Sequence, residues 1–196
     1  MCSSDLPSRG YHGVRFFETF GDFAFTMRVR METLRTFGPA ISPFNAWMLV
    51  QGIETLHLRM PRHVESTRKV VAFLASHAAV EKILYPENPD HPDHALAKRL
   101  LPKGCGAVFS FDIRGGREAG RRFIESLRVF SHLANIGDAK SLVIHPATTT
   151  HYRMSDEDLK KAGIGPGTIR LSIGLEDPED LVQDLERSLA AAAKAR

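Results

Sequence analysis

Two short segments of this chain concentrate residue types that bind small anions. Residues 135–151 read Asn-Ile-Gly-Asp-Ala-Lys-Ser-Leu-Val-Ile-His-Pro-Ala-Thr-Thr-Thr-His, which combines hydroxyl groups, histidines and backbone amides. Residues 167–174 alternate in polarity, so that the apolar residues share one face of a strand and Arg170 lies on the other. An arginine at the centre of a strand is costly to bury unless a carboxylate or phosphate pairs with its planar guanidinium. The two segments therefore predict a site for a small carboxylate, and the alternative is a surface arginine in an ion pair.

Helices are expected in the first part of the chain. Residues 23–37 place apolar residues at helical spacing and are followed by a Gly-Pro pair that ends a helix. Ser42 and Pro43 fit the N-cap and first position of the next helix. Residues 44–58 are apolar nearly all round, which indicates deep burial or an interface between chains. A further helix is expected over residues 62–77.

From residue 80 onward the pattern alternates between strands and helices. The expected order is strand 80–85, helix 93–101, strand 107–113, a helix after Gly115-Gly116, strands near 130–135 and 141–145, a short helix with a capping box at Ser155 and Asp158, the strand of Arg170, and a last helix beginning at Asp177-Pro178. The last helix has a stripe of residues expected to be buried: Leu181, Leu185, Leu189 and Ala192. This order predicts an α/β fold with helices packed on a small sheet.

Composition narrows the class of protein. The 196 residues are 43% hydrophobic and 25% charged, as is ordinary for a soluble globular protein. The net charge of +3 is too small and too dispersed to indicate nucleic-acid binding, and no apolar run is long enough for a membrane span or a signal peptide. Two cysteines form no disulfide framework, so a cytoplasmic location is expected. Pairs of histidines lack cysteine or carboxylate partners, so no metal site is predicted.

Several separated segments agree, in order, with one known family. They read GYHG, SPFNAW, QGIETL, LRM, HPDHALAKRLLPKG, NIGDAKSLVIHPATTTH and IRLSIGLEDPEDL. They resemble the pyridoxal-phosphate (PLP) enzymes of cysteine and methionine metabolism, and within that family most resemble the O-acetylhomoserine sulfhydrylases. The resemblance implies the C-terminal small domain of the aminotransferase-type (fold type I) transferase fold. Residues 1–58 would be the tail of the PLP-binding large domain with a connecting helix, and residues 59–196 the small domain.

The resemblance also implies which residues bind substrate. Arg170 would hold the α-carboxylate of the amino-acid substrate, Ser141 would lie near the substrate, and the Leu142 backbone would help to orient the carboxylate. Thr150 is a further, weaker candidate. The alternative for Ser141 is a serine that bonds the backbone at a strand start, and for Thr150 a hydroxyl that satisfies its own turn. Ser66 departs from the family, which usually has asparagine there, with no assigned consequence.

The lysine that carries the cofactor in this family lies in a Ser-x-Thr-Lys motif, which is absent from this sequence. No catalytic residue is therefore expected in this chain, which resembles the last portion of such an enzyme; a fragment, a split gene and an alternative start are all open. Lys140 is not that lysine, because its neighbours match another motif. A lysine at this position favours the sulfhydrylase branch, since related lyases often carry an acidic residue there.

The function implied by the resemblance is that of a PLP-dependent transferase that makes homocysteine or methionine from O-acetylhomoserine and sulfide or a thiol. The implied intact enzyme is a homo-oligomer, a dimer or tetramer, with a small amino-acid substrate. Two alternatives remain. The chain is a non-catalytic folded domain or assembly partner, or it is a fragment of a related γ-lyase or γ-synthase.

Overall fold

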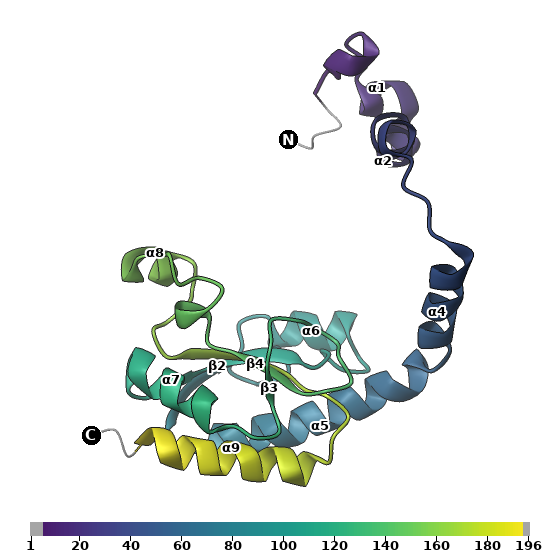
Figure 1. Ribbon diagram of the computed structural model, residues 1–196. Coiled ribbons are helices and arrows are strands. Elements are labelled where there is room, and N and C mark those ends of the chain that lie inside the picture. Colours follow the sequence, from purple (N-terminus) through teal and green to yellow (C-terminus); the bar gives the residue numbers. More distant parts are fainter. Residues whose placement is uncertain (1–5, 194–196) are drawn as a thin grey trace. The chain divides into compact units, whose positions relative to one another are not determined.

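The computed structural model of the protein describes residues 6–193, and the chain divides between Glu54 and Thr55 into two compact units (Figure 1). The first unit is built from short helical segments: 3₁₀ turns at Arg9–Tyr11 and Gly21–Phe23, α1 (Phe16–Phe20), α2 (Ala24–Arg28), a π-helical turn at Val29–Leu34, α3 (Arg35–Phe37) and α4 (Pro43–Glu54). The prediction of a helix over residues 23–37 is confirmed, with a wider turn in its middle. Gly38 ends it at φ 60°, a conformation that glycine adopts without strain.

Helix α4 begins as predicted, because the Ser42 hydroxyl accepts a hydrogen bond from the Asn45 amide at 3.2 Å. It ends at Glu54, and α5 (Leu56–Ser76) starts at once. The predictions of a helix that continues to residue 58 and of a new helix from residue 62 are therefore wrong. Pro61 lies in the second turn of α5, where it removes one backbone hydrogen bond without ending the helix.

Within the first unit, the deep-burial alternative for the helix after Pro43 is also wrong. Most large apolar side chains of α4 are exposed, for example Trp47 at 56% and Ile53 at 64%. Exposed apolar area on this scale drives association with another surface. The interface alternative stays a prediction.

We expect the isolated chain to self-associate at tens of micromolar, because α4 exposes contiguous apolar surface. Sedimentation velocity should show species larger than a monomer, and a hydrophobic dye should bind. Replacing Leu49 and Ile53 with glutamine should reduce both signals, whereas the same replacement at buried Leu189 should unfold the chain. A parent chain that sediments as a clean monomer without binding dye contradicts this prediction.

The second unit carries a five-stranded sheet, counted over residues 6–193, in the order β1-β2-β5-β4-β3. The strands are β1 (Val80–Leu84), β2 (Val108–Ile113), β3 (Ser131–His132), β4 (Leu142–Ile144) and β5 (Thr168–Ser172). All neighbours are antiparallel except β3 and β4. The helices between and after them are α6 (His94–Leu100), α7 (Gly116–Ser126), α8 (Asp156–Lys161) and α9 (Pro178–Ala193). The predicted order of strands and helices from residue 80 onward is confirmed.

Helices α5, α7 and α9 pack against one face of the sheet and form the core with it (Figure 1). Apolar residues of alternating position on β2 and β5 enter this core, among them Phe109, Phe111, Ile169 and Leu171. The predicted stripe on the last helix is buried as expected: Leu181, Leu185, Leu189 and Ala192. Because successive strand residues alternate between faces, Arg170 lies on the sheet face away from these helices.

Asp184 joins α9 to the segment between α7 and β3. Its carboxylate is 3% exposed and accepts hydrogen bonds from the backbone amides of Arg128 and Val129 at 2.8–3.0 Å, with a longer bond from Phe130. Arg187 pairs with the same carboxylate. Backbone amides shielded from water need acceptors, so this one buried side chain serves part-buried donors just before β3.

No helix within residues 6–193 is both long enough and apolar enough to span a membrane.

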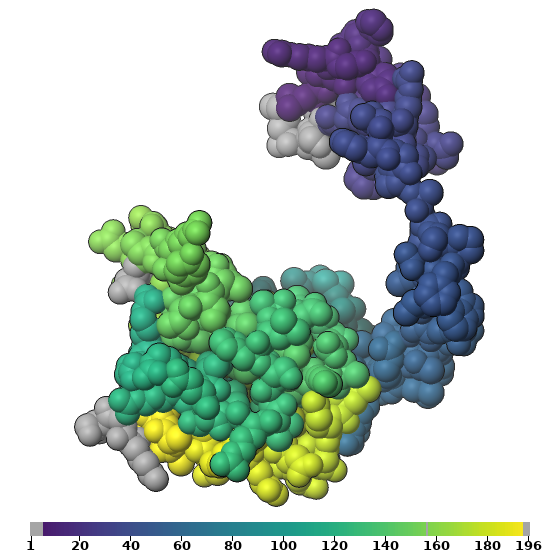
Figure 2. Space-filling view, in the orientation of Figure 1, coloured from purple at the N-terminus to yellow at the C-terminus, as the bar shows by residue number. Residues whose placement is uncertain are grey.

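Figure 2 shows the region of α8, in light green, projecting from the body of the second unit. Its N-terminus is capped as predicted, since the Ser155 hydroxyl accepts from the Asp158 amide at 3.2 Å.

Candidate carboxylate-binding site

Arg170 occupies the centre of β5, between Ser110 of β2 and Ile144 of β4. Its side chain is partly exposed, and its Nη2 donates to the carbonyl oxygen of Asn135 at 3.3 Å. No Asp or Glu side chain of the part of the chain that the structure describes forms an ion pair with it. A guanidinium has five N–H donors in a planar fork, so Arg170 keeps donors for an external carboxylate.

The segment that precedes β4 crosses the same region and is attached to β5 and to the turn after it. The Gly137 amide donates to the Ser172 hydroxyl at 3.3 Å, and the Leu175 amide donates to the Ala139 carbonyl at 2.8 Å. Together with the Arg170–Asn135 bond, these contacts lay residues 135–141 along β5 and the turn after it, with Asn135 at the arginine. We call residues 135–141 the crossing segment.

Ser141 ends the crossing segment and is fully buried. Its amide and its hydroxyl donate to the two carboxylate oxygens of Glu176, at 2.7 and 2.8 Å, and its hydroxyl accepts from the Gly174 amide at 2.8 Å. The hydroxyl proton and one lone pair of Ser141 are thus committed to the turn between β5 and α9. A contact of this hydroxyl with a substrate stays a prediction.

The other two predicted site residues lie differently. Leu142 is buried and pairs with Ser172 across β4 and β5, so its backbone lies within two strand positions of Arg170. Thr150 is exposed beyond the 3₁₀ turn Pro146–Thr148, and its hydroxyl lies 2.8 Å from Nδ1 of His151. The structure therefore places Leu142 within two strand positions of Arg170, with Ser141 next to it in sequence, and within positions 6–193 Thr150 has no hydrogen bond to any of these residues.

His145, at the end of β4, is fully buried and supports the loop that carries Thr150. Its Nε2 lies 2.8 Å from the Pro166 carbonyl, to which it donates, and its Nδ1 lies 2.9 Å from the Thr148 hydroxyl. Burial lowers the pKa of His145, and the positive charge of Arg117 acts in the same direction. A neutral imidazole with both nitrogens bonded internally is a structural group.

Two residues at this site were missed by the sequence analysis. Glu176 was passed over as part of the approach to the last helix, although it lies just before the Asp-Pro helix start. Asn135 was included in the motif without a role. A carboxylate between a strand and a helix start is a weak signal of a site residue, because such side chains are usually solvated. The sequence spacing also gives no indication that Glu176 lies beside Ser141, which is 35 positions away.

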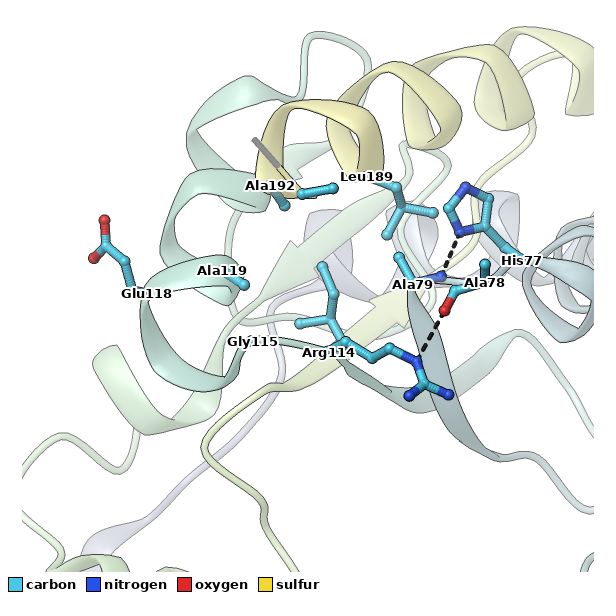
Figure 3. Close-up of a pocket in the computed structure, with 11 residues that line it drawn as sticks. His77, Ala78, Ala79, Arg114, Gly115, Glu118, Ala119, Leu189 and Ala192 are labelled. Carbon is cyan, nitrogen blue, oxygen red and sulfur yellow. Dashed lines mark hydrogen bonds between the residues drawn. The ribbon is translucent and has the colours of Figure 1, made fainter. Parts of the chain in front are cut away.

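A separate pocket of about 410 Å³ lies at the far ends of α5 and α9 (Figure 3). Its walls are mostly small and apolar, including Ala79, Ala119 and Leu189, while the Glu118 side chain points away from it. Arg114 is held there by its Nε donating to the Ala78 carbonyl at 2.9 Å. This pocket shares no residue with the arginine site. Across the described positions, no group of three His, Cys, Asp or Glu side chains is arranged to hold a metal ion.

We expect Gly174→Ala to destabilise the second unit by about 1–3 kcal/mol, the usual range for overpacking. A Cβ at this position would collide with Glu176 Oε2 and the Ala139 carbonyl. Urea unfolding followed by circular dichroism measures the change. Gly52→Ala is the matched control, because a Cβ there meets no neighbour within 4 Å and alanine is the better helix former. Equal midpoints for both variants contradict the packing described here.

Comparison with known proteins gives the class of this chain. A model of the Cys/Met metabolism PLP-dependent enzyme family matches residues 18–190, and the chain belongs to that family. An O-acetyl-L-homoserine sulfhydrylase of Leptospira meyeri is 47% identical over 192 residues, which cover 93% of this chain and 43% of the relative. An O-succinylhomoserine sulfhydrylase of Pseudomonas aeruginosa is 48% identical over 158 residues, 81% of this chain and 39% of the relative.

A solved structure agrees with these relatives. A provisionally assigned O-acetylhomoserine (thiol)-lyase of Campylobacter jejuni matches with a TM-score of 0.81 and 39% identity, over 96% of this chain and 44% of that chain. That structure carries an N'-pyridoxyl-lysine-5'-monophosphate. The resemblance to the O-acetylhomoserine sulfhydrylases is thus confirmed, and this chain spans less than half of the length of its relatives.

The cofactor of this family is pyridoxal phosphate. The residues around Arg170 do not fit a binding site for its phosphate or ring, because the hydroxyls there are already bonded: Ser141 to Glu176 and Gly174, and Ser172 to Gly137. The described buried hydroxyls without a hydrogen-bond partner are Ser66 and Ser188, which lie on helices α5 and α9 and not at this face. Within residues 6–193 this face therefore presents the guanidinium donors of Arg170 and no buried hydroxyl without a partner.

Proposed function

We propose that this chain is the carboxylate-binding part of a PLP-dependent enzyme that makes homocysteine or methionine from O-acetylhomoserine and sulfide or a thiol. The supporting observation is Arg170: a partly exposed guanidinium at the centre of a strand, with a single long hydrogen bond to Asn135 and no acidic partner within residues 6–193. The identity of 47% to an O-acetyl-L-homoserine sulfhydrylase supports the reaction type.

In this proposal the chain binds and orients the substrate. Arg170 pairs with the α-carboxylate through two parallel N–H donors, which fixes the rotation of the substrate about its Cα bonds. The Leu142 backbone, paired with Ser172, and Ser141 before it are the next candidates for this role, and Thr150 is a further candidate from the loop after β4. PLP, held by other parts of the complete enzyme, supplies the electron sink for the chemistry.

A completed enzyme tests the proposal. The upstream part of the Leptospira meyeri relative, joined to this chain, should release homocysteine from O-acetylhomoserine and sulfide. O-succinylhomoserine should be tested in parallel, because a relative of similar identity is named for that substrate. A folded, PLP-loaded fusion that turns over neither ester contradicts the proposed reaction. One that only releases the carboxylate (acetate or succinate) with 2-oxobutanoate and ammonia, without incorporating sulfide, indicates a γ-lyase instead.

A second candidate function is a non-catalytic folded domain or assembly partner. It is favoured by the second unit, which has its own core formed by the sheet and three helices. Under this candidate the chain associates with a complete subunit through α4. Co-expression with such a subunit, followed by size-exclusion chromatography and activity assays, separates the two candidates, since an assembly partner changes the subunit's oligomeric state without contributing a substrate site.

A further inference from the structure

The crossing segment is held by contacts of unequal strength. The Arg170–Asn135 and Gly137–Ser172 bonds are both 3.3 Å long, near the upper limit for such interactions. Glu176 instead receives two short bonds from Ser141, at 2.7 and 2.8 Å. Hydrogen bonds to an ionised carboxylate are roughly twice as strong as neutral ones. Glu176 is therefore the strongest side-chain attachment of this segment to the turn after β5.

Gly174 and Leu175, the two residues before Glu176, also bind the crossing segment. Gly174 donates its amide to the Ser141 hydroxyl, and only a glycine fits there because a Cβ would meet the Ala139 carbonyl and Glu176. The adjacent Leu175 amide bonds to the Ala139 carbonyl at 2.8 Å. Three consecutive residues, Gly174 to Glu176, thus bind the end of the crossing segment.

We propose that Glu176 is a positioning residue for the carboxylate site: by binding the amide and hydroxyl of Ser141 it fixes the crossing segment beside Arg170. The inference rests on the proposed function for the role of Arg170. The Asn135 carbonyl belongs to this segment and bonds the guanidinium, so the position of the segment sets how many donors Arg170 presents to a ligand. Glu176 itself does not touch the substrate in this proposal.

Hydrogen exchange of the chain tests the attachment without any catalytic assay. Glu176→Ala should raise the exchange rate of the Ser141 amide at least tenfold, because its acceptor is lost. Glu176→Gln should stay within about threefold of the parent, since its side-chain oxygen can still accept from the Ser141 amide, although its NH2 group cannot accept the Ser141 hydroxyl proton. Glu179→Ala, an exposed position in the first turn of the following helix α9, is the matched control and should leave the rate unchanged.

Kinetics of the completed enzyme test the link to Arg170. Glu176→Ala should raise KM for the amino-acid substrate about tenfold with a smaller change in kcat, and Glu176→Gln should restore most of the loss. In the Arg170→Ala background, Glu176→Ala should have little further effect, because residues that act through one site are not additive. With a substrate analogue that lacks the α-carboxylate, the Glu176 variants should have the same KM as the parent.

The outcomes distinguish a failure of the Glu176 proposal from a failure of the proposed reaction. Unchanged protection of Ser141 in Glu176→Ala overturns the attachment, whatever the activity of the completed enzyme. Raised exchange with fully additive effects of the Glu176 and Arg170 substitutions overturns the positioning role. If the completed enzyme is inactive but Ser141 exchange responds as expected, only the proposed reaction is contradicted. The positioning role is then tested directly by measuring acetate binding to Arg170 by NMR in the parent and Glu176→Ala chains. Equal affinities of the two chains for acetate overturn the positioning role.

Discussion

Arg170→Ala in the completed enzyme is expected to lower kcat/KM by roughly 30- to 1000-fold, with the fold retained. The guanidinium makes a charge-assisted pair with the substrate carboxylate, worth about 2–4 kcal/mol when desolvated. The structure supports this because Arg170 is partly exposed and donates one long bond to the Asn135 carbonyl. Steady-state kinetics with O-acetylhomoserine measures the change, and circular dichroism checks the fold.

Two controls make the result specific to the carboxylate. Arg170→Lys should recover only part of the activity, because an ammonium group lacks the planar two-donor fork. The decarboxylated analogue of the substrate should lose much less activity in Arg170→Ala, since it never used the arginine. Equal losses for both substrates, or an alanine variant within threefold of the parent, show that Arg170 is not the carboxylate anchor.

Asp184→Ala is expected to destabilise the second unit by about 3 kcal/mol and to lower Tm by roughly 10 °C. The buried carboxylate is the acceptor for the amides of Arg128 and Val129, so its removal leaves part-buried donors without their partner. Asp184→Asn should cost less, about 1–2 kcal/mol, because one oxygen remains to accept. Thermal unfolding followed by circular dichroism measures both variants.

Glu186→Ala is the matched control for this prediction. Glu186 is exposed on the same helix, two positions from Asp184, so its replacement should change stability by less than about 0.5 kcal/mol. If Asp184→Ala is no more destabilising than Glu186→Ala, the attachment of α9 to the segment at Arg128–Phe130 does not contribute to stability.

Local sequence patterns predicted most elements of the second unit. The alternation around Arg170 is strict, so β5 and its inward face followed from the two-residue period of a strand. The apolar stripe of α9 follows the helical period and is buried along its length. Caps such as Ser155 were predictable because the donor and the acceptor lie within one turn.

The boundary between α4 and α5 was not predictable in this way. The sequence pattern predicted one helix to residue 58 and another from residue 62, yet the helix breaks at Thr55 and α5 passes through Pro61 without interruption. A proline early in a helix removes one hydrogen bond, and the burial of Val64, Val70 and Leu74 farther along α5 compensates for that loss. Whether burial outweighs the lost hydrogen bond depends on tertiary packing, which a local sequence pattern does not reveal.

The candidate site shows the same division. The sequence by itself determined that Arg170 lies at the centre of a strand and faces away from the core, because chain geometry and residue polarity are local properties. Only the tertiary structure decided that the crossing segment lies beside Arg170 and that Glu176 binds Ser141. Those contacts join residues 35 positions apart, and they depend on strand order and on a turn in which only glycine fits at position 174.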